Sequence, residues 1–226
     1  MARGLSPGRS LGEERLGRGS GLIRLAVSVE GSTEREFVNT TLAPHLRQFA
    51  IFTTPIDLRG PANLDRIANE LKRLLPNFDR VTTLYDYYAF QRRAGLTPDE
   101  LATAIGERAP EGTRARVIGY IQQYELEALM FADPDKTAEI LAVPEIAKRL
   151  ADVVAQCGPP EQIDDGYESC PSRRLAGIYP GWDKVLHGPR VTQAIGIAGI
   201  AAKCPRFAAW IARLESLNDP GNSQPA

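Results

Sequence analysis

The sequence predicts an α/β fold in which a mostly parallel sheet lies between layers of helices. Two observations support this prediction. Short runs of β-branched and apolar residues alternate with amphipathic segments through the first half, and helical patterns fill the second half. The chain of 226 residues is long enough for one domain with a large core, which we expect over residues 22–218.

The first half of the chain alternates strand and helix patterns. Strands are predicted over residues 23–29, 49–57, 80–86 and 115–122, and helices over residues 33–48, 63–75 and 97–109. Thr33 and Glu36 have the spacing of a capping box, and Thr97 followed by Pro98 is typical of a helix start. Pro55 has no N–H to donate, which favours an edge position for the second strand.

The second half is predicted to form a helical cover on the same domain. Its helices are expected over residues 126–132, 134–142, 144–156, 189–202 and 205–217. Residues 158–173 are rich in Gly, Pro, Asp and Ser and are expected to form a loop. Cys204 and Pro205 indicate a turn between the last two helices.

The two ends of the chain differ in composition from the rest. Residues 1–21 are rich in Arg, Gly and Ser and have no apolar segment, which excludes a secretory signal. We interpret them as a disordered leader, or as the product of a start codon assigned too far upstream. Residues 219–226 are expected to form a flexible tail.

Composition excludes several classes of protein. Lys and Arg number 27 and Asp and Glu number 28, so the net charge does not suit a protein that coats nucleic acid by charge alone. Three cysteines without a CxxC motif argue against a zinc ribbon and favour reduced thiols in a cytoplasm. No apolar run approaches the roughly 18 residues of a membrane span. Neither a P-loop nor a dinucleotide-binding motif is present.

Acidic residues follow three of the four predicted strands. Glu30 ends the first strand, Asp86 ends the third, and Glu125 and Glu127 follow the fourth. Ligands of parallel α/β sheets bind beyond the carboxyl ends of the strands, so we expect these side chains to meet there, with Gly31 allowing a sharp turn into the next helix. Clustered carboxylates repel one another unless a cation such as Mg²⁺ or Mn²⁺ lies between them, and such a site suits phosphodiester chemistry.

Each acid also has a simpler interpretation. Glu34 lies in a first helical turn, where it either reaches the site or only complements the helix dipole. Asp86 is either a ligand or a turn residue. Glu125 and Glu127 are two residues apart, which is about 200° around a helix. Both reach the site only if Glu125 belongs to the strand end and Glu127 opens the helix.

A basic segment with aromatic residues follows the loop. Within "PSRRLAGIYPGWDKVLHGPR" we select Arg174 and Lys184 as candidate contacts to substrate phosphates. Tyr179 and Trp182 either pack into the core or stack on a nucleic acid. His187 precedes a glycine and is a secondary candidate, as is Glu34.

Two of these segments resemble the motifs of TOPRIM-type domains, which are Rossmann-like. "VSVEGSTEREFV" resembles the first motif, a strand ending in Glu followed by Gly and a helix. "VTTLYDYYAF" resembles the second motif, usually Asp-x-Asp, but Tyr88 stands in place of the second Asp. The resemblance implies that Glu30 is a general acid/base or metal ligand and that Asp86 is a metal ligand. Glu125 or Glu127 would then supply the missing carboxylate.

The chain as a whole resembles the bacterial family called domain of unknown function 4276, a TOPRIM-like group. The matching segments also include "YIQQYELEALMF", "PSRRLAGIYPGWDKVLHGP" and "CPRFAAWIARLE", and together they span about residues 24–217. This resemblance implies Mg²⁺-dependent phosphoryl-transfer chemistry. Relatives of this type include nuclease domains of the overcoming-lysogenization-defect class, which pair with ATPases in bacterial defence against phage.

The sequence supports two hypotheses of function. The first is a metal-dependent nuclease in which Glu30, Asp86 and one of Glu125 or Glu127 hold Mg²⁺ or Mn²⁺. The second is a non-catalytic binding or regulatory subunit of an ATPase system, which the missing second Asp favours. The nuclease requires the carboxylates to converge, whereas the binding subunit requires an exposed apolar patch, expected on the helical cover.

Overall fold

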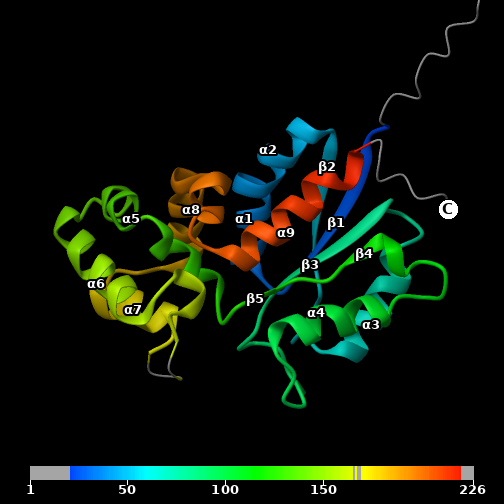
Figure 1. Cartoon of the computed structure of the whole chain (residues 1–226), viewed down its shortest axis with the longest axis horizontal. Helices are drawn as coiled ribbons and strands as arrows, with labels where there is room; N and C mark the ends of the chain where they lie inside the picture. The colour runs from blue at the N-terminus through cyan, green and yellow to red at the C-terminus, as the bar shows by residue number, and fades with distance from the viewer. Residues whose placement is uncertain (1–20, 165, 167–168, 220–226) are drawn as a thin grey trace, which may run out of the picture.

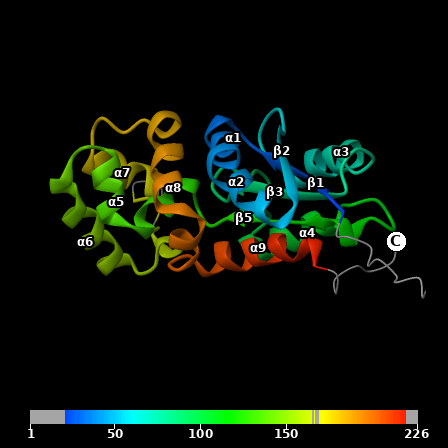
Figure 2. The ribbon, with the colours of Figure 1, turned by 90° about the horizontal axis from the view of Figure 1, so that it is seen from above.

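The computed structural model describes residues 21–164, 166 and 169–219 (Figure 1). Apart from residues 21 and 219, the predicted leader and the predicted tail lie outside the described residues. Among the described residues the chain forms a parallel sheet with helices on both faces and a group of helices beside it, as Figures 1 and 2 show. The prediction of an α/β fold is confirmed.

The sheet has the order β2–β1–β3–β4, with β5 also paired to β3, and all these pairs are parallel. The strands are β1 (Ile23–Val29), β2 (Ile51–Asp57), β3 (Arg80–Asp86), β4 (Val117–Ile118) and β5 (Ile121–Gln122). Pro55 lies in the edge strand β2, as predicted. The register pairs Val29 with Leu84, so β1 and β3 end at the same edge of the sheet.

The predicted strand over residues 115–122 is interrupted in the middle. Gly119 separates β4 from β5, and a Cβ added there would lie 2.1 Å from the carbonyl oxygen of Ala102 in α4 (Pro98–Glu107). The helix therefore packs directly on the backbone at this point. Thr83 replaces the missing ladder bonds, because its hydroxyl accepts from the Tyr120 N–H and donates to the Tyr120 carbonyl, both at 2.8 Å.

Helices α3 (Leu64–Leu74) and α4 cover one face of the sheet (Figure 1). Their apolar sides pack on inward residues of the strands such as Ala26, Val81 and Tyr85. The predicted start of α4 is confirmed: Thr97 accepts from the Glu100 N–H at 3.3 Å, and Glu100 accepts from the Thr97 N–H at 2.8 Å.

The segment after β1 covers the other face. It runs through α1 (Ser32–Phe37), the π-helical η1 (Val38–Leu42), α2 (Ala43–Leu46) and the 3₁₀-helical η2 (Arg47–Phe49). The predicted capping box of Thr33 and Glu36 is wrong, because the N-cap residue lies two positions before Thr33. Gly31 is the N-cap residue, and Glu34 accepts from its N–H at 3.0 Å.

The second half is helical, with differences from the prediction. Its α-helices are α5 (Pro134–Ile140), α6 (Ala147–Cys157), α7 (Pro171–Ile178), α8 (Lys184–Ala201) and α9 (Pro205–Glu215). Short 3₁₀ helices are η3 (Arg114–Arg116), η4 (Leu126–Ala132), η5 (Pro144–Ile146), η6 (Pro160–Gln162) and η7 (Ser216–Asn218). Residues 126–132 are thus a 3₁₀ helix, and α7, which begins inside the segment expected to be a loop, was not predicted.

Helix α8 also begins earlier than the predicted residue 189. Asp183 caps its start by accepting from the N–H groups of Val185 and Leu186 at 2.9 and 3.1 Å. Pro189 therefore lies inside the helix, where its missing N–H removes the usual bond to the carbonyl oxygen of Val185. The helix breaks at Gly196, whose φ of 75° is unfavourable for other residues.

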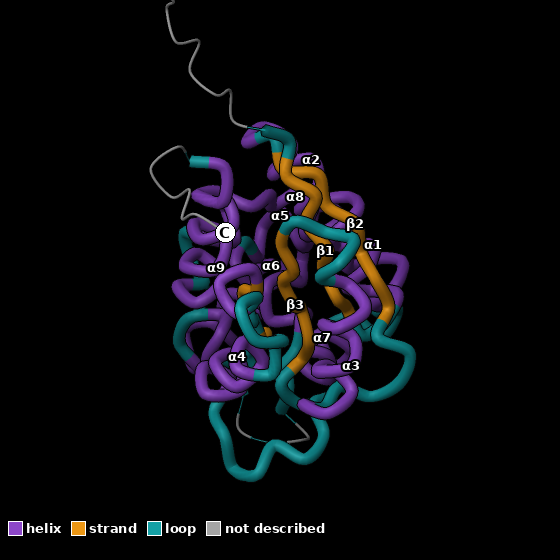
Figure 3. Tube along the Cα trace, turned by 90° about the vertical axis from the view of Figure 1, so that its right-hand side faces the viewer, coloured by secondary structure: helices purple, strands orange, loops and turns teal. Residues whose placement is uncertain are grey.

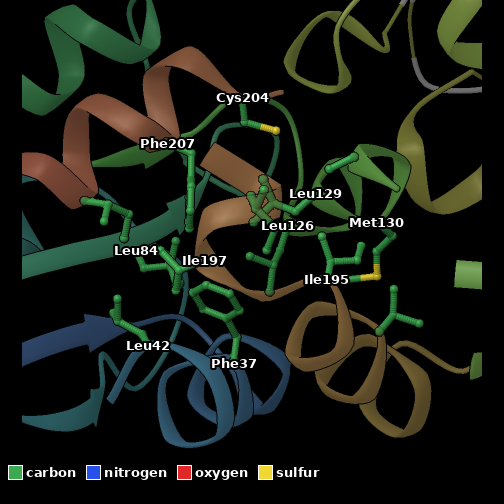
Figure 4. Packing of buried hydrophobic residues seen from close by; sticks show 14 of the residues in the cluster. Phe37, Leu42, Leu84, Leu126, Leu129, Met130, Ile195, Ile197, Cys204 and Phe207 are labelled. Atoms are coloured by element: carbon green, nitrogen blue, oxygen red, sulfur yellow. The ribbon is translucent and has the colours of Figure 1, made fainter. Parts of the chain in front are cut away.

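One hydrophobic cluster extends from the sheet face into the group of helices. It joins Phe37 of α1, Leu84 of β3, Met130 of η4, Ile195 of α8 and Phe207 of α9 (Figure 4). The rings of Phe37 and Phe207 meet edge to face at 6.1 Å. Figure 3 shows the strands of the sheet with helices on both sides of them. The helical cover therefore shares its core with the sheet.

None of Cys157, Cys170 and Cys204 forms a disulfide among the residues described. Over the same residues, no individual helix has both the length and the apolar composition needed to cross a membrane. Helices α8 and α9 with η7 satisfy those two criteria only as a pair bent by 87°.

Candidate acidic site at the strand ends

Five acidic residues gather at the carboxyl ends of β1 and β3. Glu30 directly follows β1, Asp86 is the last residue of β3, and Glu34 lies in the first turn of α1. Glu125 is the N-cap residue of η4, and Glu127 lies two residues further along that helix. The carboxyl group of Asp86 is repelled by all four of the others, which places them around it.

Asp86 is the centre of this group. Burial of its carboxyl group raises its pKa well above the usual range, and repulsion by Glu34, Glu127, Glu125 and Glu30 raises it further. The Oδ1 atom of Asp86 is buried and has no hydrogen-bond partner among the described residues. Buried acceptors are nearly always paired, so this oxygen is poised for a ligand.

Glu127 is buried beside Asp86, with 3% of the residue exposed. Burial and the repulsion of Glu125 raise its pKa to about 7, while Lys184 lowers it. Burial by itself would lower the pKa of Lys184, but the attraction of Glu127, Glu34, Asp86 and Glu125 raises it overall. Lys184, the first residue of α8, therefore places a cation beside these carboxylates.

Backbone N–H groups hold three of the carboxylates. Glu34 accepts from Gly31 at 3.0 Å, Glu125 accepts from Ser172 at 2.9 Å, and Glu30 accepts from Ala62. An ionised carboxylate offers about four acceptor positions, so each of these groups keeps positions for another ligand. The pKa of Glu30 is nevertheless raised, chiefly by burial.

The two interpretations of Glu125 and Glu127 are resolved by the local backbone. Glu125 has extended φ and ψ angles of −142° and 155°, and η4 begins after it. The two side chains therefore do not follow the rotation of a regular helix, and both repel Asp86. Gly31 is also extended, with φ of −151°, so our interpretation that a glycine is needed there for a sharp turn is wrong.

The side chains do not form a finished metal site as they stand. Among the described residues, no three His, Cys, Asp or Glu side chains are grouped closely enough to hold a metal ion. Mg²⁺ commonly takes one or two carboxylates and completes its shell with water and phosphate oxygens. The partnerless Oδ1 of Asp86, with Glu30, Glu34 or Glu127 beside it, fits that mode of binding.

The basic candidates lie on two helices. Lys184 faces the carboxylates, as described above. Arg174 lies in α7, where its Nε donates to the carbonyl oxygen of Ser169 at 2.6 Å.

His187 closes the first turn of α8. Its Nδ1 accepts from the Asp183 N–H at 2.9 Å, and its ring contacts those of Trp182 and Tyr179 with centroids 5.6 and 5.7 Å away. These contacts give His187 a structural role, because they hold the turn that presents Lys184.

Three tyrosines beside Asp86 were not selected from the sequence. The rings of Tyr87, Tyr88 and Tyr124 contact one another with centroids 5.4–6.5 Å apart. The hydroxyl of Tyr88, the residue in place of the second Asp, is hydrogen-bonded to Asp164. The sequence pattern that could have identified them is their position, since all three tyrosines adjoin strand ends.

A sequence model of the family described as Domain of unknown function (DUF4276) matches residues 29–215, which include the whole acidic site. The chain belongs to this family. The match spans both the sheet and the helical cover, so the DUF4276 region includes Lys184 as well as the carboxylates. No curated protein matches the sequence.

Solved structures with a similar arrangement come from two OLD proteins. The C-terminal region of the Burkholderia pseudomallei OLD protein is 16% identical with a TM-score of 0.48, over 85% of this chain and 98% of that one. The C-terminal region of the Xanthomonas campestris pv. campestris OLD protein is 20% identical with a TM-score of 0.38, over 84% of this chain and 95% of that one. The similarity is too distant to carry a function to this DUF4276 chain.

Proposed function

We propose that this protein is a divalent-metal-dependent phosphodiesterase acting on nucleic acid, with a TOPRIM-like arrangement of its acidic site. The observation that carries the proposal is the buried, partnerless Oδ1 of Asp86 inside a group of like-charged carboxylates. A purely structural site gains nothing from this arrangement, because repulsion and lost solvation both destabilise it. A bound cation would remove both costs.

The residues divide into three roles. Asp86 and Glu30, with Glu127 or Glu125, would hold Mg²⁺ or Mn²⁺ beside a substrate phosphate. The metal would supply charge stabilisation and a more acidic bound water. Where Glu125 is the third ligand, Glu127, with a pKa of about 7, is suited to accept a proton from water and to return one to the leaving oxygen. Lys184 would contact the phosphate oxygens, because it already faces the same site.

The test is cleavage of labelled single- and double-stranded DNA and RNA with Mg²⁺, with Mn²⁺ and with EDTA. We expect metal-dependent cleavage that Glu30→Gln and Asp86→Asn each abolish, with both variants folded by circular dichroism. The exposed Asp135→Asn is the matched control and should cleave normally. Cleavage that survives EDTA, or that survives Asp86→Asn, would contradict the proposal.

One observation favours a second candidate, a binding subunit of an ATPase that works in the cytoplasm in defence against phage. Val185 and Leu186 are 45% and 48% exposed at the start of α8, and Ile140 of α5 is 39% exposed. Replacing Val185 and Leu186 by Asp should then abolish co-purification of ATPase activity from the native host. The exposed Phe52→Ser on β2 should not. Metal-dependent cleavage by the isolated protein would favour the first candidate.

A further inference from the structure

A groove rich in arginine lies beside the acidic site. It has a volume of about 660 Å³ and is bordered by the loop after β2, by α3 and by the loop after β3. The charged residues that line it are Arg59, Arg66, Arg73, Arg92, Asp65 and Glu70, and we call it the arginine groove. None of these residues was among the site residues predicted from the sequence.

The positive charge of the arginine groove is largely uncompensated. Glu70 is bonded to Arg73 at 2.6 and 3.1 Å, and Asp65 is bonded to Arg108, which lies outside the groove. Among the described residues, no carboxylate pairs with Arg59, Arg66 or Arg92. Three guanidinium groups are therefore available to an anion, on a protein whose net charge is −1.

The backbone presents these arginines toward solvent. Arg59 and Arg92 are exposed and adopt left-handed φ angles of 53° and 55° at the turns of their loops. Arg66 is held by its Nη1, which donates to the carbonyl oxygen of Arg59 at 2.6 Å. Two loops and one helix thus contribute one cation each to the same concave surface.

The arginine groove is connected directly to the acidic site. Its wall includes Pro61 and Asn63, and the residue between them, Ala62, donates its N–H to the carboxylate of Glu30. The carbonyl oxygen of Ala62 accepts from the N–H of Gln91, another lining residue, at 2.7 Å. A ligand lying in the groove would therefore lead to Glu30.

We propose that the arginine groove binds the phosphate backbone of a polynucleotide strand whose reacting phosphate lies at Asp86 and Glu30. This inference rests on the proposed function and deepens it, because it assigns the surface that holds the polynucleotide strand beyond the reacting phosphate. A mononucleotide would occupy only the acidic site, so it would leave the three arginines of the neighbouring groove without a phosphate to bind. Guanidinium groups suit the task because they pair with phosphate oxygens and read no sequence.

The test is the binding of a labelled single-stranded oligonucleotide, measured by fluorescence anisotropy with Ca²⁺ in place of Mg²⁺ so that no turnover is needed. The variant is Arg59→Ala with Arg92→Ala. Two lost phosphate contacts lower the slope of log K against log salt by about 1.4, which weakens binding about 25-fold at 0.1 M salt. Arg114→Ala, which replaces an exposed arginine at the start of η3, is the matched control and should bind normally.

Arg73→Ala is a second comparison inside the groove. Because Glu70 already neutralises Arg73, its loss should weaken binding less than the loss of Arg59 or Arg92. A mononucleotide at the same phosphate concentration should not displace the oligonucleotide. Displacement by the mononucleotide would overturn the assignment of a polymer.

The two proposals fail in different ways. If the wild type cleaves, and the Arg59→Ala, Arg92→Ala variant binds and cleaves normally, the proposed role of the arginine groove is wrong and the phosphodiesterase stands. If binding depends on Arg59 and Arg92 but no metal supports cleavage, the proposed phosphodiesterase activity is wrong and the arginine groove stands as a binding site. If folded wild-type protein binds no oligonucleotide, the proposal that the arginine groove binds a polynucleotide is wrong.

Discussion

Lys184 at the start of α8 and Glu127 in η4 attract each other across the acidic site, and each changes the pKa of the other. The two residues are brought together by packing of α8 against η4 and not by closeness in the sequence. Their pairing makes the charge of the site sensitive to pH near neutrality, because Glu127 titrates at about 7. It also places a cation where a substrate phosphate would lie.

Glu127→Gln should remove part of the pH dependence of stability. The pKa of Glu127 is raised in the folded protein, so its contribution to stability is present below its unfolded pKa and is lost as pH rises through about 7. Keeping this carboxyl group ionised in the fold costs on the order of 3 kcal/mol. Urea unfolding at pH 5 and pH 8 should therefore show a smaller loss of stability for Glu127→Gln than for the wild type.

The exposed Glu139→Gln on α5 is the control for this comparison and should follow the wild type. An equal loss of stability in wild type and Glu127→Gln between the two pH values would mean that Glu127 is ionised in both states at pH 5.

Lys184→Met should move the titration of Glu127 to higher pH. The ammonium group lowers the pKa of Glu127, so its removal leaves burial and Glu125 opposed only by the backbone hydrogen bond to the carboxylate. Stability would still begin to fall at the unfolded pKa, but the fall would continue to a higher pH than in the wild type. Unfolding measured in steps from pH 5 to pH 9 reports this change, and Lys203→Met, in the turn after α8, should titrate like the wild type. A shift toward lower pH would contradict the pairing.

The position of the acids could be predicted from the sequence because it depends on local patterns. Glu30 and Asp86 end runs of β-branched residues, and the ends of parallel strands meet at one edge of a sheet. Pro55 likewise identified the edge strand. Strand periodicity is enough to predict where the acids lie, and the missing N–H of proline is enough to predict the edge strand.

The remaining parts of the site depend on tertiary packing. Lys184 reaches the carboxylates because Asp183 and His187 start α8 five residues before the predicted position. Ala62 and Ser172 contribute only backbone N–H groups, which no residue pattern reveals. The arginines of the groove are spread over two loops and a helix, so their shared surface exists only in the folded chain.

Glu161→Ala should destabilise the protein by about 2–3 kcal/mol. Glu161 is 3% exposed, and its carboxylate accepts from the N–H groups of Arg206 and Phe207 at 2.9 Å each, at the start of α9. The N-cap residue Cys204 makes no side-chain capping bond, so removal of Glu161 leaves the buried N–H of Phe207 and the part-buried N–H of Arg206 unpaired. Urea unfolding measures the change, and the exposed Glu111→Ala should change stability little. A loss below about 0.5 kcal/mol would show that water replaces the carboxylate.

Asp86→Asn should stabilise the metal-free protein and abolish its stabilisation by metal. The substitution removes a buried carboxyl group whose ionised form is disfavoured by burial and by four neighbouring carboxylates, so the thermal midpoint should rise without metal. In the wild type, Mg²⁺ or Mn²⁺ at ten times its dissociation constant should add about 1.4 kcal/mol, which is about 3–5 °C. Thermal unfolding of both proteins at pH 8, with EDTA and with each metal, measures the two effects.

Asp135→Asn, on the exposed side of α5, is the control and should keep both the wild-type midpoint and the full metal shift. An Asp86→Asn variant that is less stable without metal would mean that a hydrogen bond to Asp86 outweighs the repulsion. A full metal shift in Asp86→Asn would place the cation on Glu30, Glu34 or Glu127 and leave the buried Oδ1 without a ligand. The pair of measurements therefore separates the electrostatic cost of Asp86 from its service as a metal ligand, and does so without any assay of cleavage.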